Sequence, residues 1–213
     1  MARQMGEQLR HRGPDSSGEW LDPQLATALA FRRLAILDLS EAGHQPMVSA
    51  DGRFVLAVNG EIYNHRPLRQ ELEQAGHRFR GHADSEVLLE AISEWGLAAA
   101  LNRSIGMFAL AVVDRRERAL MLARDRLGEK PLYYGWSGEQ FFFGSELKAF
   151  RPHPGFRAEV DPGALALYMG QGYVPTPHCI LAGFHKLLPG SILSLPLDGS
   201  ARPGAEKLQS YWS

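Results

Sequence analysis

Three groups of polar residues stand where apolar runs end or are interrupted, and each could contact a small charged ligand. Asn59-Gly60 follows the apolar run 54–58. A side-chain amide donor beside a backbone N–H is one way to stabilise a developing oxyanion. Asn-Gly is also a common turn dipeptide, so the spacing alone leaves both interpretations open.

Arg32 and Arg33 interrupt an apolar stretch that runs from residue 28 to residue 37. A guanidinium in such a stretch is costly unless it meets an anion, and a carboxylate is its natural bidentate partner. One of the two arginines could instead face water or pair with a nearby aspartate. Asp84 precedes an apolar pattern of helical period, where it could cap the helix or bind a ligand ammonium.

These groups together suit one class of ligand. An arginine for a carboxylate, an aspartate for an ammonium and amide donors for a carbonyl oxygen would bind a free amino acid that carries a side-chain amide. The eight histidines show no metal-ligand spacing, so no metal site is expected. Cys179 is interpreted as a buried core residue, because its sequence neighbour His178 cannot face it as a catalytic base would. Phe141-Phe142-Phe143 is interpreted as core, since no basic groove accompanies it.

The elements that must position these residues form a mixed pattern. Apolar spacing and turn signals predict helices at 3–12, 65–75, 84–95 and 161–170. They predict strands at 27–37, 54–58, 107–113, 119–123, 132–136, 140–144 and 191–197. Strict alternation of strand and helix is absent, which favours helices layered on antiparallel sheet over a parallel α/β fold. Residues 198–209 are polar and rich in proline and glycine, as in a linker that leaves a domain.

Composition excludes several classes of protein. The chain has 213 residues, 45% hydrophobic and 22% charged, which excludes a disordered tail, a collagen-like repeat and a coiled coil. No apolar run approaches the roughly 18–20 residues that span a bilayer, so no membrane partner is expected. The net charge of −1 argues against a nucleic-acid partner. A single cysteine and no visible secretory signal predict a cytoplasmic protein.

Nine motifs follow one another along the chain in the order of a known family. They are Arg10-His11-Arg12-Gly13-Pro14-Asp15, Arg33-Leu34-Ala35-Ile36-Leu37-Asp38, Gln45-Pro46-Met47, Asn59-Gly60-Glu61-Ile62-Tyr63-Asn64, Asp84-Ser85-Glu86, Gly106-Met107-Phe108-Ala109, Ala123-Arg124-Asp125-Arg126-Leu127-Gly128, Lys130-Pro131-Leu132-Tyr133-Tyr134 and Ser145-Glu146-Leu147-Lys148-Ala149. The whole chain thereby resembles the glutaminase domain of glutamine-hydrolysing asparagine synthetases, a class II glutamine amidotransferase of the N-terminal-nucleophile hydrolases. The resemblance implies an α+β fold: a four-layer αββα sandwich of two mainly antiparallel sheets flanked by helices.

The resemblance also implies roles for individual residues. Arg33 would clamp the α-carboxylate of glutamine, Glu61 and Asp84 would hold its α-ammonium, and Asn59 with the Gly60 N–H would form the oxyanion hole. The implied glutamine-binding residues are Arg33, Leu34, Ile36, Leu37, Asn59, Gly60, Glu61 and Asp84.

The chain departs from the family at two places. The family's nucleophile is a cysteine at the mature N-terminus, on a strand that precedes the helix predicted at 3–12, whereas this chain opens with Met1-Ala2. Loss of that thiol and its α-amine implies a rate loss of about 10⁶, by analogy with serine proteases. The neighbouring strand would then lack a partner. The residues 210–213 resemble the junction with a synthetase domain, so the resemblance implies an amidotransferase domain at 1–200 and the start of a linker at 201–213.

In the parent enzyme, the resemblance implies that glutamine is hydrolysed to glutamate and ammonia for the ATP-dependent amidation of aspartate. ATP and magnesium would belong to the linked synthetase domain, and this chain would bind no cofactor. Assembly into a homodimer is left open. Two other interpretations stay open. In the first, the chain is a degenerate glutamine-binding or scaffold module without catalysis. In the second, it is the amidotransferase domain of a polysaccharide or antibiotic biosynthesis enzyme with a different acceptor.

Overall fold

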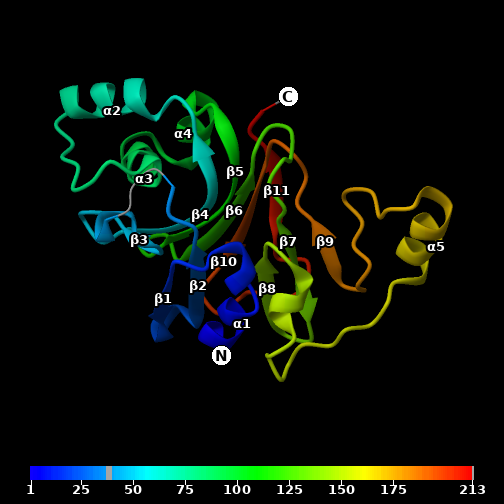
Figure 1. Ribbon diagram of the computed structural model, residues 1–213. Coiled ribbons are helices and arrows are strands. Elements are labelled where there is room, and N and C mark those ends of the chain that lie inside the picture. Colours follow the sequence, from blue (N-terminus) through cyan, green and yellow to red (C-terminus); the bar gives the residue numbers. More distant parts are fainter. Residues whose placement is uncertain (37–39, 213) are drawn as a thin grey trace.

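The computed structural model describes residues 1–36 and 40–212, and its elements are labelled in Figure 1. The helices are α1 (Ala2–Glu7), α2 (His65–Gln74), α3 (Asp84–Trp95), α4 (Leu97–Arg103) and α5 (Pro162–Gln171), with short 3₁₀ turns that include η1 (Arg10–Arg12) and η4 (Leu147–Phe150). The strands are β1 (Ser16–Asp22), β2 (Thr27–Arg33), β3 (Met47–Val48), β4 (Phe54–Ile62), β5 (Gly106–Asp114), β6 (Ala119–Arg124), β7 (Tyr133–Ser137), β8 (Gln140–Gly144), β9 (Phe184–Lys186), β10 (Ser191–Pro196) and β11 (Lys207–Ser210). No helix in the described ranges has the length and apolarity that a bilayer crossing requires.

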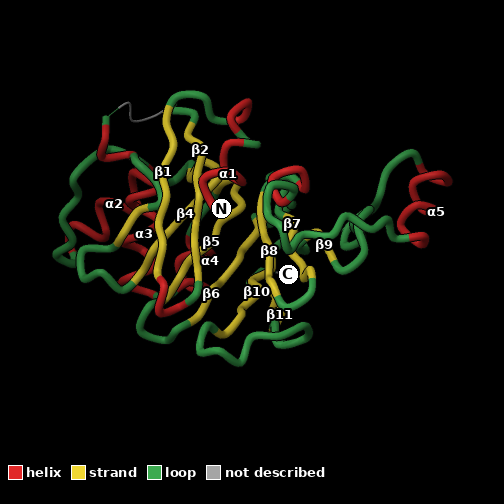
Figure 2. The backbone as a smooth tube through the Cα atoms, turned by 90° about the horizontal axis from the view of Figure 1, so that it is seen from below, coloured by secondary structure: helices red, strands yellow, loops and turns green. Residues whose placement is uncertain are grey.

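The strands of the described residues form one large and two small antiparallel sheets. The large sheet has six strands in the order β11-β10-β6-β5-β4-β3. A hairpin of β1 and β2 and a three-stranded sheet in the order β8-β7-β9 lie against it (Figures 1 and 2). The β1–β2 hairpin and the β8-β7-β9 sheet are not hydrogen-bonded to one another among the described residues, so β2 and β8 each have one open edge.

Three separate apolar clusters hold four layers together. Between α2–α3 and the six-stranded sheet, the core includes Leu72, Leu88 and Leu110. On the other face of this sheet, a second core joins it to β1–β2 and β7–β8 and includes Leu29 and Leu122. A third cluster packs α1 and η4 on the outside of β7–β9. The predicted αββα sandwich is confirmed.

Alternation along individual strands explains how the layers are built. In β4, Leu56 packs toward the helices while Val55 packs toward the small sheets. In β8, Phe142 belongs to the outer cluster, whereas Phe141 and Phe143 pack on the inner one. Successive strand side chains point to opposite faces, so a continuous apolar run is what a strand between two cores requires. The interpretation of Phe141–Phe143 as core is confirmed.

The turn interpretation of Asn59-Gly60 is wrong, because β4 continues through both residues to Ile62. Asn59 lies opposite Ala109 and Gly60 opposite Phe108 in the β4–β5 ladder. A Cβ on Gly60 would lie 2.2 Å from the carbonyl oxygen of Met107. Glycine is therefore required here by the close approach of the neighbouring strand and not by a turn.

The segment 207–210 also differs from the linker that its polarity suggested. It forms β11, which pairs antiparallel with β10 at the edge of the large sheet. All four residues of β11 are exposed, and an exposed edge strand carries no apolar face that the sequence would reveal. Tyr211 follows it into the core and donates a hydrogen bond from its hydroxyl to the Arg124 carbonyl at 3.0 Å.

His77 ties the loop between α2 and α3 to the side of α3. Its Nδ1 lies 2.6 Å from Glu90 Oε2, and its Nε2 lies 3.0 Å from Glu94 Oε2. The hydrogen bond with Glu94, helped by the one with Glu90, raises the pKa of His77 against the opposing effect of partial burial. The doubly paired imidazolium therefore stabilises the helix that carries Asp84 at its N-terminal end.

We expect His77→Gln to lower the free energy of unfolding by about 1 kcal/mol at pH 6 and by less at pH 9. The folded-state pKa lies above the unfolded value of about 6.5. The contribution of the charged ring is thus fully present below pH 6.5 and is lost as pH rises through the folded pKa. Urea unfolding at the two pH values measures the difference, with His178→Gln as the exposed control. A cost that does not change with pH would contradict this assignment.

Candidate functional site

A pocket of about 1180 Å³ lies between the open edges of β2 and β8, and we call it the slot. All seven residues of β2 and all five of β8 line it. Because strand side chains alternate between faces, an unbroken run of lining residues means that the strand edge itself faces the pocket. The slot is therefore bounded by two rows of backbone groups that have no strand partner.

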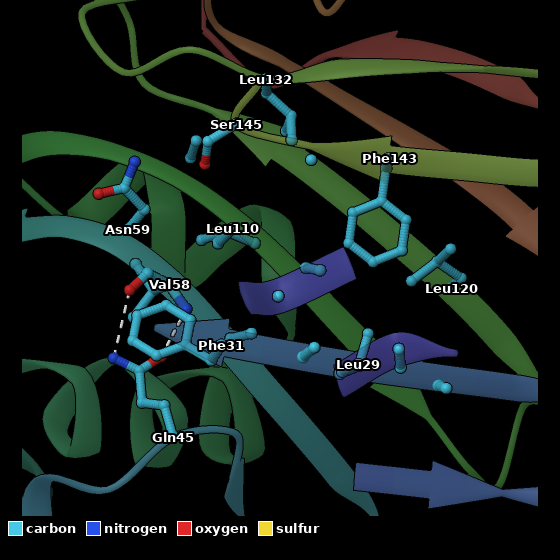
Figure 3. A pocket seen from close by; sticks show the side chains of 18 of the residues that line it. Leu29, Phe31, Gln45, Val58, Asn59, Leu110, Leu120, Leu132, Phe143 and Ser145 are labelled. Carbon is cyan, nitrogen blue, oxygen red and sulfur yellow. Dashed lines mark hydrogen bonds between the residues drawn. The ribbon is translucent and has the colours of Figure 1, made fainter. Parts of the chain in front are cut away.

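Apolar side chains form most of the slot's inner surface. Leu29, Leu120, Leu132 and Phe143 line it and are labelled in Figure 3. Leu120 comes from the large sheet, while Leu29 and Phe143 come from the two strands at the open edges. A segment placed here would bury one face against the second core.

The outer side of the slot is covered by α1, and the 3₁₀ turn η1 that follows α1 is held by an ion cluster at Glu146. Met1, Ala2 and Met5 line the slot. Glu146 accepts hydrogen bonds at 3.0 Å from His11 and Arg12, and Lys148 lies 3.2 Å from it. Burial alone would raise the pKa of Glu146, but hydrogen bonds from Arg12, His11 and Lys148 outweigh it and lower the pKa to about 2. The carboxylate stays charged at neutral pH and fixes the end of η1 against η4.

One end of the slot is polar, and it brings together the residues that the sequence singled out. Seven of the eight predicted glutamine-binding residues line it: Arg33, Leu34, Ile36, Asn59, Gly60, Glu61 and Asp84. The eighth, Leu37, lies outside the described residues. Asn59 and Glu61 share the face of β4 that carries Val55 and Ala57, which is the face toward the slot.

Asn59 carries an unpaired buried donor. Its Nδ2 is buried and has no hydrogen-bond partner among the described residues. Leaving such a group unpaired costs about 1–3 kcal/mol, so its retention calls for an explanation. Figure 3 shows the Asn59 side chain directed toward the part of the slot that holds Ser145. An oxygen atom of a bound molecule at this place would satisfy the donor.

Gln45 fixes β4 one residue before Asn59. Its Oε1 accepts from the Val58 N–H at 2.6 Å, and its Nε2 donates to the Val58 carbonyl at 3.2 Å (Figure 3). The side-chain amide thus replaces a strand partner opposite Val58, because β3 begins only at Met47, which pairs with Leu56. Sequence reasoning placed Gln45 in a motif without a role, because the contact joins residues 13 positions apart.

The two adjacent arginines have different surroundings. Arg33 donates from Nη1 to the Ser40 carbonyl at 2.9 Å, and a Cβ on Gly43 would lie 2.0 Å from Arg33 Nη2. Because Gly43 has no side chain, the Arg33 guanidinium can occupy the space beside it. Arg32 instead donates to the Gly13 carbonyl at 3.0 Å and to Glu7 at 3.3 Å. The expectation that one arginine pairs with an acid is met by Arg32, with a glutamate in place of the predicted aspartate.

Asp84 is not the N-cap of α3, as one interpretation of the sequence held. The cap position is Ala83, and it makes no side-chain hydrogen bond. Asp84 accepts from the Ile62 N–H at 2.7 Å and from the Ser85 N–H at 2.9 Å, which fastens the start of α3 to the end of β4. A carboxylate has about four acceptor positions, so two remain for a ligand. In the described part of the chain, the Glu61 carboxylate makes no hydrogen bond or ion pair.

Asp15 holds the backbone that follows Arg33, a role that sequence reasoning missed. Its Oδ2 accepts from the Ala35 N–H at 2.8 Å, and its own N–H donates to the Arg33 carbonyl at 3.1 Å. The side chains of Leu34 and Ile36 are exposed, so these residues can contribute to the polar end through their backbone. The signal available in the sequence was the position of Asp15 in the first motif.

Cys179 lies away from this site. It is buried in the outer cluster with Phe142, Phe150 and Phe184 and does not line the slot. Burial raises the pKa of its thiol, which keeps it protonated. The interpretation of Cys179 as a core residue is confirmed.

Comparison with known families decides which family the fold belongs to. Residues 1–212 match the family described as "Glutamine amidotransferase domain". The chain belongs to this family. The identification made from the nine motifs is thus confirmed for this amidotransferase domain.

Several relatives of the amidotransferase domain carry the name of one enzyme. The chain is 38% identical over 198 residues to "Asparagine synthetase [glutamine-hydrolyzing] 3" of Bacillus subtilis. This alignment covers 92% of this chain and 32% of the relative. It is 44% identical over 154 residues to a "Probable asparagine synthetase [glutamine-hydrolyzing]" of Schizosaccharomyces pombe. That alignment covers 71% of this chain and 27% of the relative. The amidotransferase domain thus spans about a third of the length of these relatives.

Solved structures support the fold of the amidotransferase domain. The allosteric regulatory enzyme of purine biosynthesis superposes with a TM-score of 0.62 at 22% identity, over 88% of this chain and 35% of that one. The glutamine phosphoribosylpyrophosphate amidotransferase of Bacillus subtilis gives a TM-score of 0.61 at 21% identity, with the same coverage of each chain. At these identities the likeness is one of fold alone.

Proposed function

We propose that this domain binds free glutamine at the polar end of the slot and contributes to the hydrolysis of glutamine to glutamate and ammonia. The observation that carries the proposal is the buried, unpaired Nδ2 of Asn59, which lies in the same pocket as Arg33, Glu61 and Asp84. A cation, two carboxylates and a free amide donor complement the α-carboxylate, the α-ammonium and the side-chain carbonyl of glutamine.

The charged residues select the amino-acid end of the substrate. Arg33 pairs with the α-carboxylate, since a guanidinium binds a carboxylate through two parallel hydrogen bonds. Glu61 and Asp84 receive the α-ammonium. Asp84 is already held by the Ile62 N–H, so the ammonium meets a carboxylate in a fixed position. The backbone of Leu34 and Ile36 lies beside the carboxylate in this proposal.

The amide donors act on the reacting carbonyl. As a nucleophile adds to the side-chain carbonyl carbon, negative charge develops on the oxygen, which Asn59 Nδ2 and the Gly60 N–H stabilise. Gln45 holds β4 beside Asn59, so the donor needs little reorganisation when the charge appears. Fixed donors of this kind are worth about 10²–10³ in kcat each.

The nucleophile is a cysteine at the head of an extended segment that fills the slot. Cys179 does not fit this role, because it is buried in another cluster. The slot exceeds the roughly 300–1,000 Å³ of small-molecule sites, and a seven-residue strand of about 23 Å matches the length of β2. Backbone groups of β2 and β8 would pair with this strand. Its α-amine, next to the thiol, would take the thiol proton as the base.

The ammonia passes to an ATP-dependent synthetase domain that amidates aspartate. The relatives' printed names support glutamine hydrolysis and asparagine synthesis, and their length, three times that of the matched part, supports a further domain. The roles of ATP and aspartate are those that the resemblance to asparagine synthetases implies. ATP and magnesium belong to that domain, and the amidotransferase domain needs neither. We place the protein in the cytoplasm and leave a homodimer as a prediction.

Glutamine binding is tested by Arg33→Ala. Glutamine at 100 times its Kd should stabilise the chain by about 2.7 kcal/mol, which raises Tm by roughly 5–10 °C for a domain of this size. Arg33→Ala should abolish this rise, because the α-carboxylate loses the guanidinium that would bind it through two parallel hydrogen bonds. Arg78→Ala, an exposed arginine in the loop before α3, is the matched control and should keep the full rise. An Arg33→Ala variant that folds and keeps the rise would contradict the assignment.

A further inference from the structure

The helix α5 stands apart from the four layers. Figures 1 and 2 both show it beyond β9, on the far side of the molecule from α2 and α3. Its stem is an isolated bridge between Val160 and Leu181, with hydrogen bonds at 2.9 Å from Asp161 N to Ile180 O and from Ala182 N to Glu159 O. We call residues 160–181 the arm.

The arm is a built structure and not a loose loop. Asp161 caps α5 by accepting from the Ala164 N–H at 2.8 Å, and Gly172 ends it in the left-handed conformation at φ +77°. Lys186 in β9 donates its side-chain ammonium to the Val174 carbonyl and its N–H to the Pro177 carbonyl. A ten-residue helix gains most of its stability from packing, yet in α5 only Ala164 is buried.

The exposed surface of the arm is apolar and uncharged. Residues 162–177 contain no charged side chain, whereas a solvent-facing helix normally carries a charged face. Its exposed apolar side chains are Val160, Leu165, Tyr168, Met169 and Tyr173. An exposed patch of this kind marks an interaction surface, and Tyr and Met are enriched in such surfaces.

A second set of exposed apolar side chains, which we call the patch, lies beyond β9. Leu188 follows β9 by two residues, so at most about 25 Å of chain separates it from the arm's stem at Leu181. Trp212 packs beside Gly190, and Leu127 precedes Gly128, which contacts Pro189. Leu127, Leu188 and Trp212 are all exposed.

We propose that the arm and this patch form the docking surface for an ATP-dependent synthetase polypeptide, whether linked to this chain or separate from it. The inference rests on the proposed function. The relatives that match this chain devote about two thirds of their length to sequence outside the matched part, which supplies an occupant. One of them, "Asparagine synthetase [glutamine-hydrolyzing] 2" of Bacillus subtilis, matches 98% of this chain, so the arm lies within the matched region. The patch includes Trp212, the last residue of the family match.

The test places a photo-crosslinking amino acid at position 169 of the protein, expressed in the cells that naturally make it. Met169 is 77% exposed and lies on the arm; Leu21, 68% exposed on β1, is the matched control position. We expect position 169 to crosslink to peptides of a synthetase sequence, with at least tenfold less product from position 21. Crosslinks to a second copy of this chain, to an unrelated protein or to nothing would overturn the proposal.

A second variant separates this proposal from the function on which it rests. Met169→Glu should reduce the synthetase recovered with the protein at least tenfold, and Leu21→Glu should not. Both variants should keep the glutamine-dependent rise in Tm, because neither position touches the polar end of the slot. If the unmodified chain shows no glutamine-dependent rise in Tm, the proposed function is wrong, whereas the crosslink still tests the docking surface. An unchanged recovery with Met169→Glu would overturn the docking surface alone.

Discussion

The 213-residue chain should release no glutamate from glutamine above background, while the same chain preceded by a strand with cysteine at its free N-terminus should be active. We expect a difference of about 10⁶ in rate, the size of effect seen when a covalent nucleophile is removed. The physical reason is that the slot positions the substrate and the amide donors, but the only thiol of the chain is buried elsewhere with a raised pKa. A coupled glutamate assay measures the rate.

The added strand can be taken from the Bacillus subtilis asparagine synthetase 3, the 38% identical relative. The matched control carries serine in place of the leading cysteine and should remain inactive while filling the slot to the same extent. Cys179→Ala should leave both forms unchanged apart from a loss of packing. Glutamate release by the unextended chain that survives Cys179→Ala would refute the assignment of the nucleophile.

In the active form, Asn59→Ala should lower kcat by about 10²–10³ with little change in KM. The Asn59 amide is the buried donor that has no partner in the described part of the chain, so its removal leaves no protein group unpaired. The variant should therefore keep the Tm of the parent within a few degrees. Steady-state kinetics and thermal unfolding separate the two effects.

Asn64→Ala is the matched control for the second prediction. The Asn64 amide is satisfied at both ends: Oδ1 accepts from the Ile105 N–H at 2.8 Å, and Nδ2 donates to the Arg103 carbonyl at 2.9 Å. Its removal should lower Tm and spare kcat, the opposite of Asn59→Ala. If Asn59→Ala instead lowers Tm and spares kcat, Asn59 is a structural residue.

Much of the fold follows from local periodicity. The strand at 107–113 and the helix at 84–95 were predicted almost to the residue, because each packs a continuous apolar pattern against a core. The strand β1 was not predicted, since Ser16, Ser17 and Gly18 give no apolar alternation and the strand exists through its pairing with β2. The strand β11 was taken for a linker for the same reason.

The members of the candidate site could be chosen from the sequence, but their supports could not. The pattern of charged and amide groups beside apolar runs indicated Asn59, Asp84 and either Arg32 or Arg33, and the resemblance selected Arg33. The structure places Arg33, Asn59 and Asp84 in one pocket. The supports Gln45 and Asp15 depend on contacts 13 and 20 positions away, which no local pattern encodes. The same holds for the two open strand edges, which appear only when the sheets are assembled.

The most direct test of the account is a crystal of this chain soaked in glutamine. We predict one glutamine at the polar end of the slot, with its α-carboxylate on Arg33, its α-ammonium between Glu61 and Asp84, and its side-chain oxygen within hydrogen-bond distance of Asn59 Nδ2. A polar end that stays empty at saturating glutamine, or a glutamine bound elsewhere, would contradict it.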